Sequence, residues 1–98
     1  VKIRSDVEMS IDGKPATMVD LSILGMMVVL APVLRPGQRV RVMIIDHDRV
    51  HRLAGTVIWS SFEMAPDRIP RYRAGVCFQG ADPMWLEDFC TRNRIKVS

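Results

Sequence analysis

The sequence predicts an all-β fold, a six-stranded antiparallel β-barrel followed by a short C-terminal α-helix. Apolar and polar residues alternate with a period of two over the first four-fifths of the 98 residues, and no long stretch there shows a sustained 3.6-residue apolar period. Turn-forming Gly, Pro and Asp residues divide this part into short runs. A chain of this length encloses one modest core, so we expect a single domain over residues 1–98.

A tight turn and a polar corner separate the first three predicted strands. The first strand runs from Lys2 to Ile11, and Asp12-Gly13-Lys14 follows as a turn, because an Asp-Gly pair tolerates the positive φ angles of tight hairpins. The second strand covers 15–20 and the third covers 26–30. Between them lies the corner Asp20-Leu21-Ser22-Ile23-Leu24-Gly25, with an acid, a hydroxyl and a glycine between two apolar runs. Such corners are where a rigid sheet presents functional groups.

The fourth and fifth strands follow a turn at Arg35-Pro36-Gly37-Gln38. The fourth strand, 39–45, is expected to face its two arginines outward and its valines and Ile44 inward. A polar hairpin tip at 46–48 leads to the fifth strand, 50–60. Alternation places Trp59 there on the same face as Leu53, Gly55 and Val57, and Gly55 suggests a bulge that helps to close the barrel.

The end of the chain is predicted to contain a loop, a last strand and the helix. Residues 62–70 hold two prolines and are expected to form an exposed loop, and the sixth strand covers 71–79. Asp82 is placed as an N-cap and Pro83 as the first helical residue. The apolar residues of this short amphipathic helix, Met84-Trp85-Leu86 and Phe89, are expected to plug one end of the barrel.

Composition restricts the class of protein further. Lys+Arg number 14 against 11 Asp+Glu, a formal charge of +3, and eleven of the cations are arginine. This arginine content reflects either recognition of phosphate and guanine or simply the base composition of the organism. Without a membrane-length apolar stretch or a signal-peptide pattern, the sequence predicts a soluble, cytoplasmic domain that does not insert into membranes. Cys77 and Cys90 are expected to be free and reduced, with Cys77 buried.

Three segments in order resemble the PilZ domain family: the corner at 20–25, Gly55-Thr56-Val57-Ile58-Trp59, and Tyr72-Arg73-Ala74-Gly75-Val76-Cys77-Phe78. The resemblance spans nearly the whole chain. It implies a PilZ-type β-barrel that serves bacterial signalling as a receptor for cyclic di-GMP. The chain begins at Val1 with a strand pattern already under way, so we expect a fragment of a longer protein.

The resemblance implies that Asp20, Ser22 and Gly25 bind the ligand. A carboxylate such as Asp20 accepts hydrogen bonds from the N–H edge of guanine, the Ser22 hydroxyl can donate and accept, and Gly25 allows positive φ or close approach of the ligand. Trp59 offers an indole for guanine stacking. The alternatives are a turn in which the three residues satisfy local backbone groups, and a core or rim tryptophan.

One family motif is absent: an Arg-x-x-x-Arg arm immediately before the first strand. Either it lies upstream of Val1, or the domain is divergent and binds no nucleotide. Arg35-Pro36-Gly37-Gln38-Arg39 has this spacing but follows the corner, so we interpret it as a solvated turn.

Other patterns give weaker signals. His47 and His51, with neighbouring acids, lack a further histidine, so no metal site is expected. No motif pairs a nucleophile with a base, so we expect neither enzyme activity nor a cofactor. The arginines at 68, 71 and 73 are interpreted as a solvated face rather than a nucleic-acid groove.

The sequence therefore predicts a receptor module that binds cyclic di-GMP and relays it by conformational change to an effector protein or flanking domain, with no nucleic-acid partner. The alternative is a PilZ-fold protein-interaction module that binds no nucleotide. A basic barrel that binds nucleic acid is a third hypothesis, which lacks aromatic residues spaced along an exposed strand.

Overall fold

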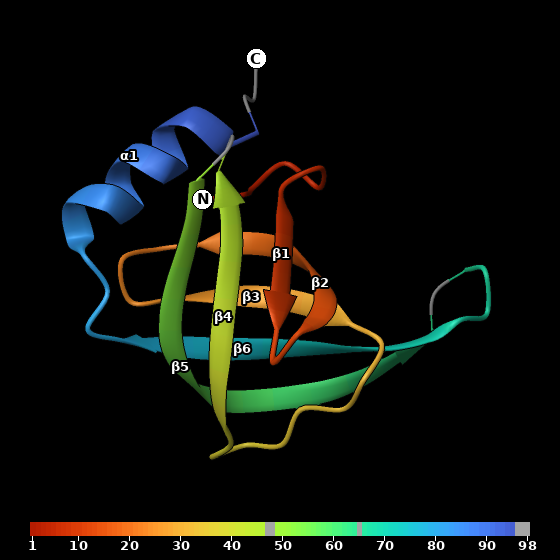
Figure 1. Cartoon of the computed structure of the whole chain (residues 1–98). Helices are drawn as coiled ribbons and strands as arrows, with labels where there is room; N and C mark the ends of the chain where they lie inside the picture. Colours follow the sequence, from red (N-terminus) through yellow and green to blue (C-terminus); the bar gives the residue numbers. More distant parts are fainter. Residues whose placement is uncertain (47–48, 65, 96–98) are drawn as a thin grey trace.

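The computed structural model describes residues 1–46, 49–64 and 66–95 of the chain. These residues form the predicted closed six-stranded antiparallel barrel, and its strand order is β1-β2-β3-β6-β5-β4 (Figure 1). One end of the barrel is covered by the helix, also as predicted. The elements are β1 (Glu8–Ile11), β2 (Lys14–Leu21), β3 (Gly25–Leu30), β4 (Arg39–Asp46), β5 (Arg49–Met64), β6 (Pro70–Gln79) and α1 (Pro83–Asn93).

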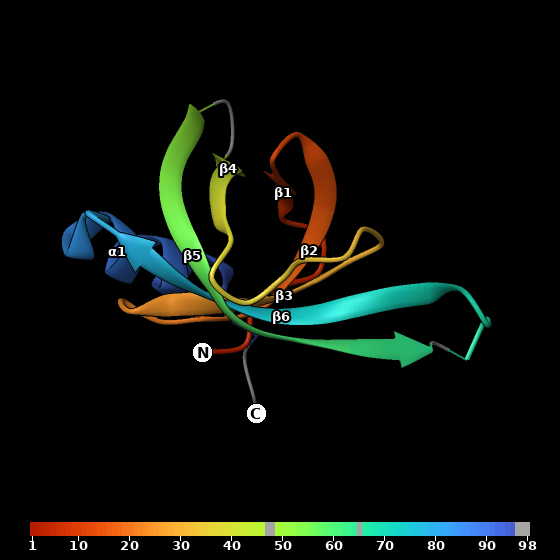
Figure 2. The same cartoon turned by 90° about the horizontal axis from the view of Figure 1, so that it is seen from below.

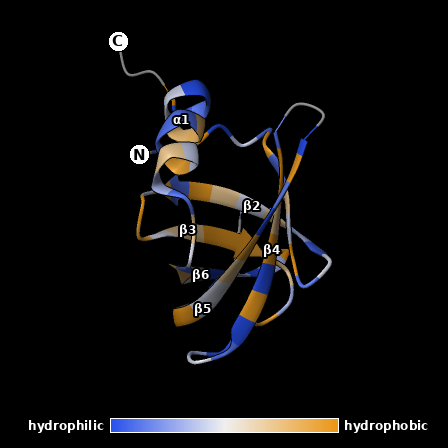
Figure 3. Ribbon diagram, turned by 60° about the vertical axis from the view of Figure 1, so that its left-hand side comes forward, coloured by the Kyte–Doolittle hydropathy of each residue, from blue (hydrophilic) through white to orange (hydrophobic). Residues whose placement is uncertain are grey.

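The alternation of side chains fills the barrel interior. On β4 the arginines face solvent while Val40, Val42 and Ile44 are buried, and Figure 3 shows the resulting alternation of hydrophilic and hydrophobic positions along this strand. Burying apolar surface in this way is the main force that holds such a domain together. The largest fully buried side chains are those of Phe89, Ile11, Met18, Leu21, Ile44 and Leu86.

The helix is held by its cap and by its buried face. The Asp82 carboxylate accepts a hydrogen bond from the Met84 N–H at 3.0 Å, and Pro83 occupies the first turn, as predicted. Leu86 and Phe89 join the core, whereas Met84 is exposed rather than packed against the barrel. The helix therefore completes the hydrophobic core as well as covering it.

Two polar contacts attach α1 to the β4–β5 hairpin. Trp85 Nε1 donates a hydrogen bond to His51 Nε2 at 2.9 Å, and the two rings contact each other with centroids 4.2 Å apart and planes tilted by 35°. Arg92 Nη2 lies 2.7 Å from Oδ2 of Asp46, whose side chain is 7% exposed. Residues 47 and 48 of the predicted hairpin tip lie outside the described residues.

The first strand is shorter than predicted. Glu8 is its first residue, because the chain turns at Arg4, whose guanidinium pairs with Asp6 at 2.7 Å and whose carbonyl accepts from the Val7 N–H. Lys2 and Ile3 still form single β-bridges, to Asp20 at the end of β2 and to Arg94 after α1. The N-terminal residues therefore lie against the corner.

The predicted loop at 62–70 is shorter than expected, because residues 62–64 and 70 belong to strands while the described residues 66–69 do not. β5 continues to Met64 and β6 begins at Pro70, which forms a two-stranded arm that projects from the barrel (Figure 2). Cross-strand contacts extend the pairing: Phe62 and Tyr72 pack edge to face with centroids 5.6 Å apart, and Glu63 pairs with Arg73 at 2.9 Å. The two strands therefore extend closer to the prolines than the sequence pattern suggested.

Two β-bulges change which side chains face outward. The β2–β3 register shifts between Met18 and Asp20, and the β5–β6 register shifts between Val57 and Trp59. Alternation predicted that Trp59 shares a face with Val57, but Val57 is buried and Trp59 faces outward. The bulge lies beyond Gly55, the residue at which it was expected. In the same way, Asp20 faces outward, although strict alternation would place it on the buried face with Met18.

Among the described residues, none belongs to a helix with the length and apolar character needed to cross a bilayer.

Candidate functional site

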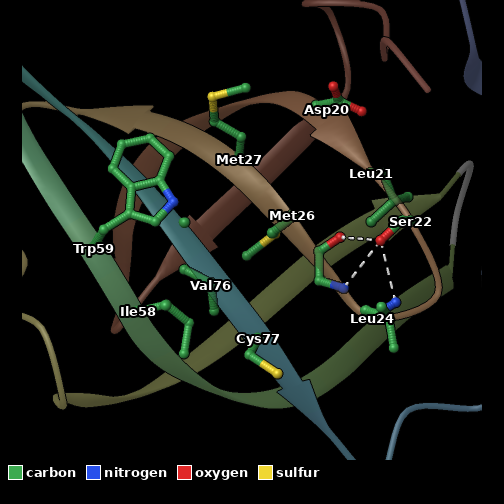
Figure 4. Close-up of a pocket in the computed structure, with 12 residues that line it drawn as sticks. Asp20, Leu21, Ser22, Leu24, Met26, Met27, Ile58, Trp59, Val76 and Cys77 are labelled. Carbon is green, nitrogen blue, oxygen red and sulfur yellow. Dashed lines mark hydrogen bonds between the residues drawn. The ribbon is translucent and has the colours of Figure 1, made fainter.

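A groove of about 490 Å³ lies on the outside of the barrel, over β2, β3, β6 and β5 (Figure 4). All four predicted site residues line it: Asp20, Ser22, Gly25 and Trp59. The strand pairing explains this arrangement. Asp20 lies opposite Met27, Met27 opposite Gly75, and Gly75 opposite Trp59, so these four residues form one row across four strands.

The row depends on the two bulges. Without the extra residue in each strand, Asp20 and Trp59 would point toward the core, because side chains alternate between the two faces of a strand. Each bulge directly precedes the residue that it redirects, so an acid and an aromatic ring are presented from opposite sides of the same groove. Bulges next to functional sites commonly aim side chains in this way.

Asp20 accepts hydrogen bonds from cationic groups. The amino group of Val1 lies 2.9 Å from its Oδ1 and the Lys2 Nζ lies 3.5 Å from its Oδ2. The hydrogen bond from the Val1 amino group, aided by the charge of Lys2, holds the pKa of Asp20 below its ordinary value, although partial burial opposes this. The carboxylate is therefore ionised at neutral pH and suited to accept N–H donors.

Ser22 forms the turn of the corner. Its Oγ accepts hydrogen bonds from the N–H groups of Leu24 at 3.2 Å and Gly25 at 3.3 Å, and lies 3.4 Å from the Gly25 carbonyl oxygen (Figure 4). The Ser22 N–H also donates to that carbonyl, at 2.9 Å. This matches the alternative in which the serine satisfies local backbone groups, and it fixes the shape of the corner between β2 and β3.

Gly25 is required by the neighbouring strand. Its φ is not in the left-handed region, so positive φ, one of the two reasons offered for a glycine here, does not apply. A Cβ at this position would overlap the carbonyl oxygen of Val76 and lie 3.1 Å from the Cα of Cys77. The glycine lets the start of β3 approach the β6 backbone, which closes the barrel beside the corner.

Gly75 provides the surface on which the Trp59 indole lies. A Cβ at Gly75 would overlap the indole Nε1 and lie 2.8 Å from both Cδ1 and Cε2. The indole is therefore flat against the β6 backbone while 41% of Trp59 remains exposed. An exposed aromatic face held on a rigid strand is suited to stack on a flat ring.

Three further residues around the groove were missed by sequence reasoning. Met27 lies between Asp20 and Trp59 (Figure 4), and Arg73 reaches its sulfur at 3.7 Å while pairing with Glu63. Cys77 is exposed in the groove, so the expectation that it is buried was wrong: it faces outward opposite Gly25. Both cysteines are free, as expected.

The PilZ domain family model matches residues 1–91. The chain belongs to the PilZ domain family. PilZ domains are generally receptors for cyclic di-GMP and typically non-enzymatic. No curated protein and no solved structure matches the chain significantly.

The groove lies at the corner formed by Asp20, Ser22 and Gly25, the segment on which the resemblance to PilZ domains was first noted. None of the described residues that line the groove is an arginine. Arg35 and Arg39, which have the spacing of the missing arm, are exposed at a turn closed by the hydrogen bond from the Gln38 N–H to the Arg35 carbonyl. They do not line the groove, in agreement with their interpretation as a solvated turn.

The remaining sequence patterns do not form a second chemical site in the described structure. No three His, Cys, Asp or Glu side chains of the described residues gather in a way that could hold a metal ion. His47 lies outside the described residues, and His51 is engaged by Trp85. In the basic cluster, Arg71 and Arg73 are each paired with a carboxylate, that of Asp67 or Glu63.

Proposed function

We propose that this PilZ domain is a cytoplasmic bacterial receptor for cyclic di-GMP, which binds in the groove between Asp20 and Trp59. The observation that carries the proposal is the pair of bulges that turn these two side chains into one outward-facing row. A guanine base needs a flat surface for its ring and an acceptor for its N–H edge. The indole supplies the first and the ionised carboxylate supplies the second.

The shape of the groove supports the same ligand. Its floor between the two polar ends is formed by Met27, Gly75 and the strands beneath, and apolar Ile58 lies at its rim with 58% exposure. Mostly apolar grooves with a few placed polar groups are typical of small-molecule sites. The Lys2 ammonium, whose Nζ lies 3.5 Å from Asp20 Oδ2, is an N–H donor like the guanine edge that would replace or join it.

Signal relay would follow from the position of the corner. Lys2 and Ile3 bridge to Asp20 and to the residue after α1, so a ligand at Asp20 contacts the same segment that touches the helix end. Ligand binding would thus shift the N-terminal segment relative to α1 and alter the surface offered to an effector protein or flanking domain. No catalytic step is part of this proposal.

Isothermal titration with cyclic di-GMP tests the proposal. We expect saturable binding, weakened about 10- to 150-fold in Asp20→Asn, because hydrogen bonds to a charged group contribute about 1.5–3 kcal/mol. Asp67→Asn is the matched control, since Asp67 is an exposed acid on the β5–β6 arm, remote from the groove. The chain should be titrated both as it stands and with any natural residues encoded before Val1.

Absence of binding in both forms would contradict the proposal and favour the PilZ-fold interaction module. Equal affinity of Asp20→Asn and the parent would remove Asp20 from the site. Binding of any oligonucleotide with a steep salt dependence would instead support the nucleic-acid hypothesis.

A further inference from the structure

The outer edge of the β5–β6 arm has no neighbouring strand within the part of the chain that the structure describes. β4 pairs with β5 only as far as Arg39 opposite Thr56, and Val57 then makes backbone hydrogen bonds with Gly37 and Gln38 at 2.7 and 2.9 Å. Beyond Val57, no strand among the described residues borders this edge of β5 (Figures 1 and 2). Its backbone N–H and C=O groups are therefore open to pairing.

This edge lacks the usual protection. Natural sheets discourage edge pairing with lysines, prolines, short strands or bulges. Residues 59–64 contain neither lysine nor proline, and the bulge lies before them, between Val57 and Trp59. Phe62 and Met64 are 57% and 54% exposed on this segment. An exposed regular edge with apolar side chains is a template for another strand.

We propose that the occupant is a second copy of this chain, paired antiparallel through β5 about a two-fold axis at Ser61. In this register Ser61 faces its own counterpart, Trp59 faces Glu63, and small Ser60 faces large Phe62, so that no two charges meet across the pair. A twofold pairing repeats each contact twice, which favours an isologous dimer.

The charges of the arm permit this pairing. Glu63 is the one acid of residues 59–64, and it faces the indole of the other copy rather than another carboxylate. Its charge is already compensated by Arg73, with Nε 2.9 Å and Nη2 3.3 Å from its two carboxylate oxygens. Like charges directly opposite each other destabilise a strand pair, and this register contains none.

The apolar side chains also gain contacts. In the proposed register the Phe62 rings of the two copies become diagonal neighbours, about 7–8 Å apart at the backbone and within reach of aromatic side chains. Each Phe62 ring is already held edge to face by Tyr72, so little further ordering is needed. The two sheets would become continuous, with the Trp59 grooves of both copies on the same face.

This proposal does not rest on nucleotide binding, because the association is measured without ligand. Sedimentation equilibrium from micromolar to millimolar concentration should show a dimer of twice the 11.1 kDa chain. Ser61→Lys should raise the dissociation constant at least about tenfold, because it places two cations together on the axis. Thr17→Lys, at an exposed position of β2 that lies opposite Val29 of β3 and away from the β5 edge, is the matched control and should leave dimerisation unchanged.

Cross-linking tests the register directly. In a Cys77→Ser background, Ser61→Cys treated with diamide should form a disulfide between two copies, since directly opposite residues are about 4.5–5.5 Å apart at Cα, within the disulfide range. Thr17→Cys in the same background should not. A chain that remains monomeric at every concentration would overturn the proposal, as would a dimer that neither responds to Ser61→Lys nor cross-links at Ser61→Cys.

Discussion

Replacement of Gly75 by alanine separates ligand stacking from folding. The new Cβ would occupy the position of the indole Nε1, so Trp59 must rotate away from the groove floor. Gly75 has no positive φ, and alanine therefore suits its strand backbone. We expect the free energy of unfolding to change by less than about 1 kcal/mol, because reduced backbone entropy of the unfolded chain offsets the lost indole packing.

The expected effect on ligand affinity is much larger. Stacking of a base on an aromatic side chain contributes about 1–3 kcal/mol, so Gly75→Ala should weaken cyclic di-GMP binding about 5- to 150-fold. Trp59→Ala should have a similar effect. The double variant should bind no more weakly than Trp59→Ala alone, because the alanine at position 75 acts only through the indole.

Isothermal titration of the parent, both single variants and the double variant gives the complete cycle. Urea denaturation of the same proteins checks that the fold is kept. Unchanged affinity in Gly75→Ala, or additive losses in the double variant, would refute the reasoning that Gly75 positions Trp59 for stacking.

Further outcomes follow from the corner and from α1. Gly25→Ala should destabilise the domain by about 1–3 kcal/mol in urea denaturation, since its Cβ meets rigid β6 backbone; an unchanged midpoint would contradict this. Ser22→Ala should lower stability by about 0.5–1.5 kcal/mol in thermal melts and weaken binding, while Ser22→Thr, which keeps the hydroxyl, should be milder. Because the pKa of Asp20 is lowered, its stabilising contacts are intact above the ordinary value of 3.8 and are lost as the pH falls through the folded pKa. Ligand affinity should therefore be constant from about pH 8 to pH 5. A loss of affinity near pH 6 would exclude this carboxylate as the acceptor. Arg92→Met should destabilise by about 1.5–3 kcal/mol in urea denaturation, because buried Asp46 loses a charged hydrogen bond; a loss below 0.5 kcal/mol would show that this contact does not hold α1.

Much of the fold could be predicted because local chemistry agrees with the tertiary structure. Asp12 and Gly13 both adopt positive φ, at 51° and 81°, as their turn demands. The alternation of β4 and the Asp82 cap of α1 are likewise local signals that the structure confirms. Each of these features is fixed by residues within a few positions of one another.

The features that shape the site depend on strand pairing and could not be predicted. A strict period of two placed Trp59 with Val57, because a bulge is visible only once β5 is paired with β6. The role of Gly75 requires knowing which side chain lies opposite it. Gly25 was identified as a site residue, but a glycine is needed there because the β6 backbone lies against it. The sequence alone does not show that β6 is beside this position.

The arm shows how a local signal can mislead. Prolines at 66 and 70 indicated a loop over 62–70, yet the contacts of Phe62 with Tyr72 and of Glu63 with Arg73 keep the strands paired almost to the tip. Cross-strand pairs of this kind each contribute about 0.2–1 kcal/mol. Together these contributions outweigh the tendency of the nearby prolines to end the strands, so pairing continues almost to the prolines themselves.

Alkylation of Cys77 measures occupancy of the groove most directly. Its thiol is exposed within the groove, whereas burial raises the pKa of the Cys90 thiol and slows its reaction, so Cys77 labels first. Saturating cyclic di-GMP should slow labelling of Cys77 by iodoacetamide in the parent, and this protection should be lost in Asp20→Asn at the same ligand concentration. Equal labelling rates with and without ligand, in a sample shown by titration to bind it, would contradict the placement of cyclic di-GMP between Asp20 and Trp59.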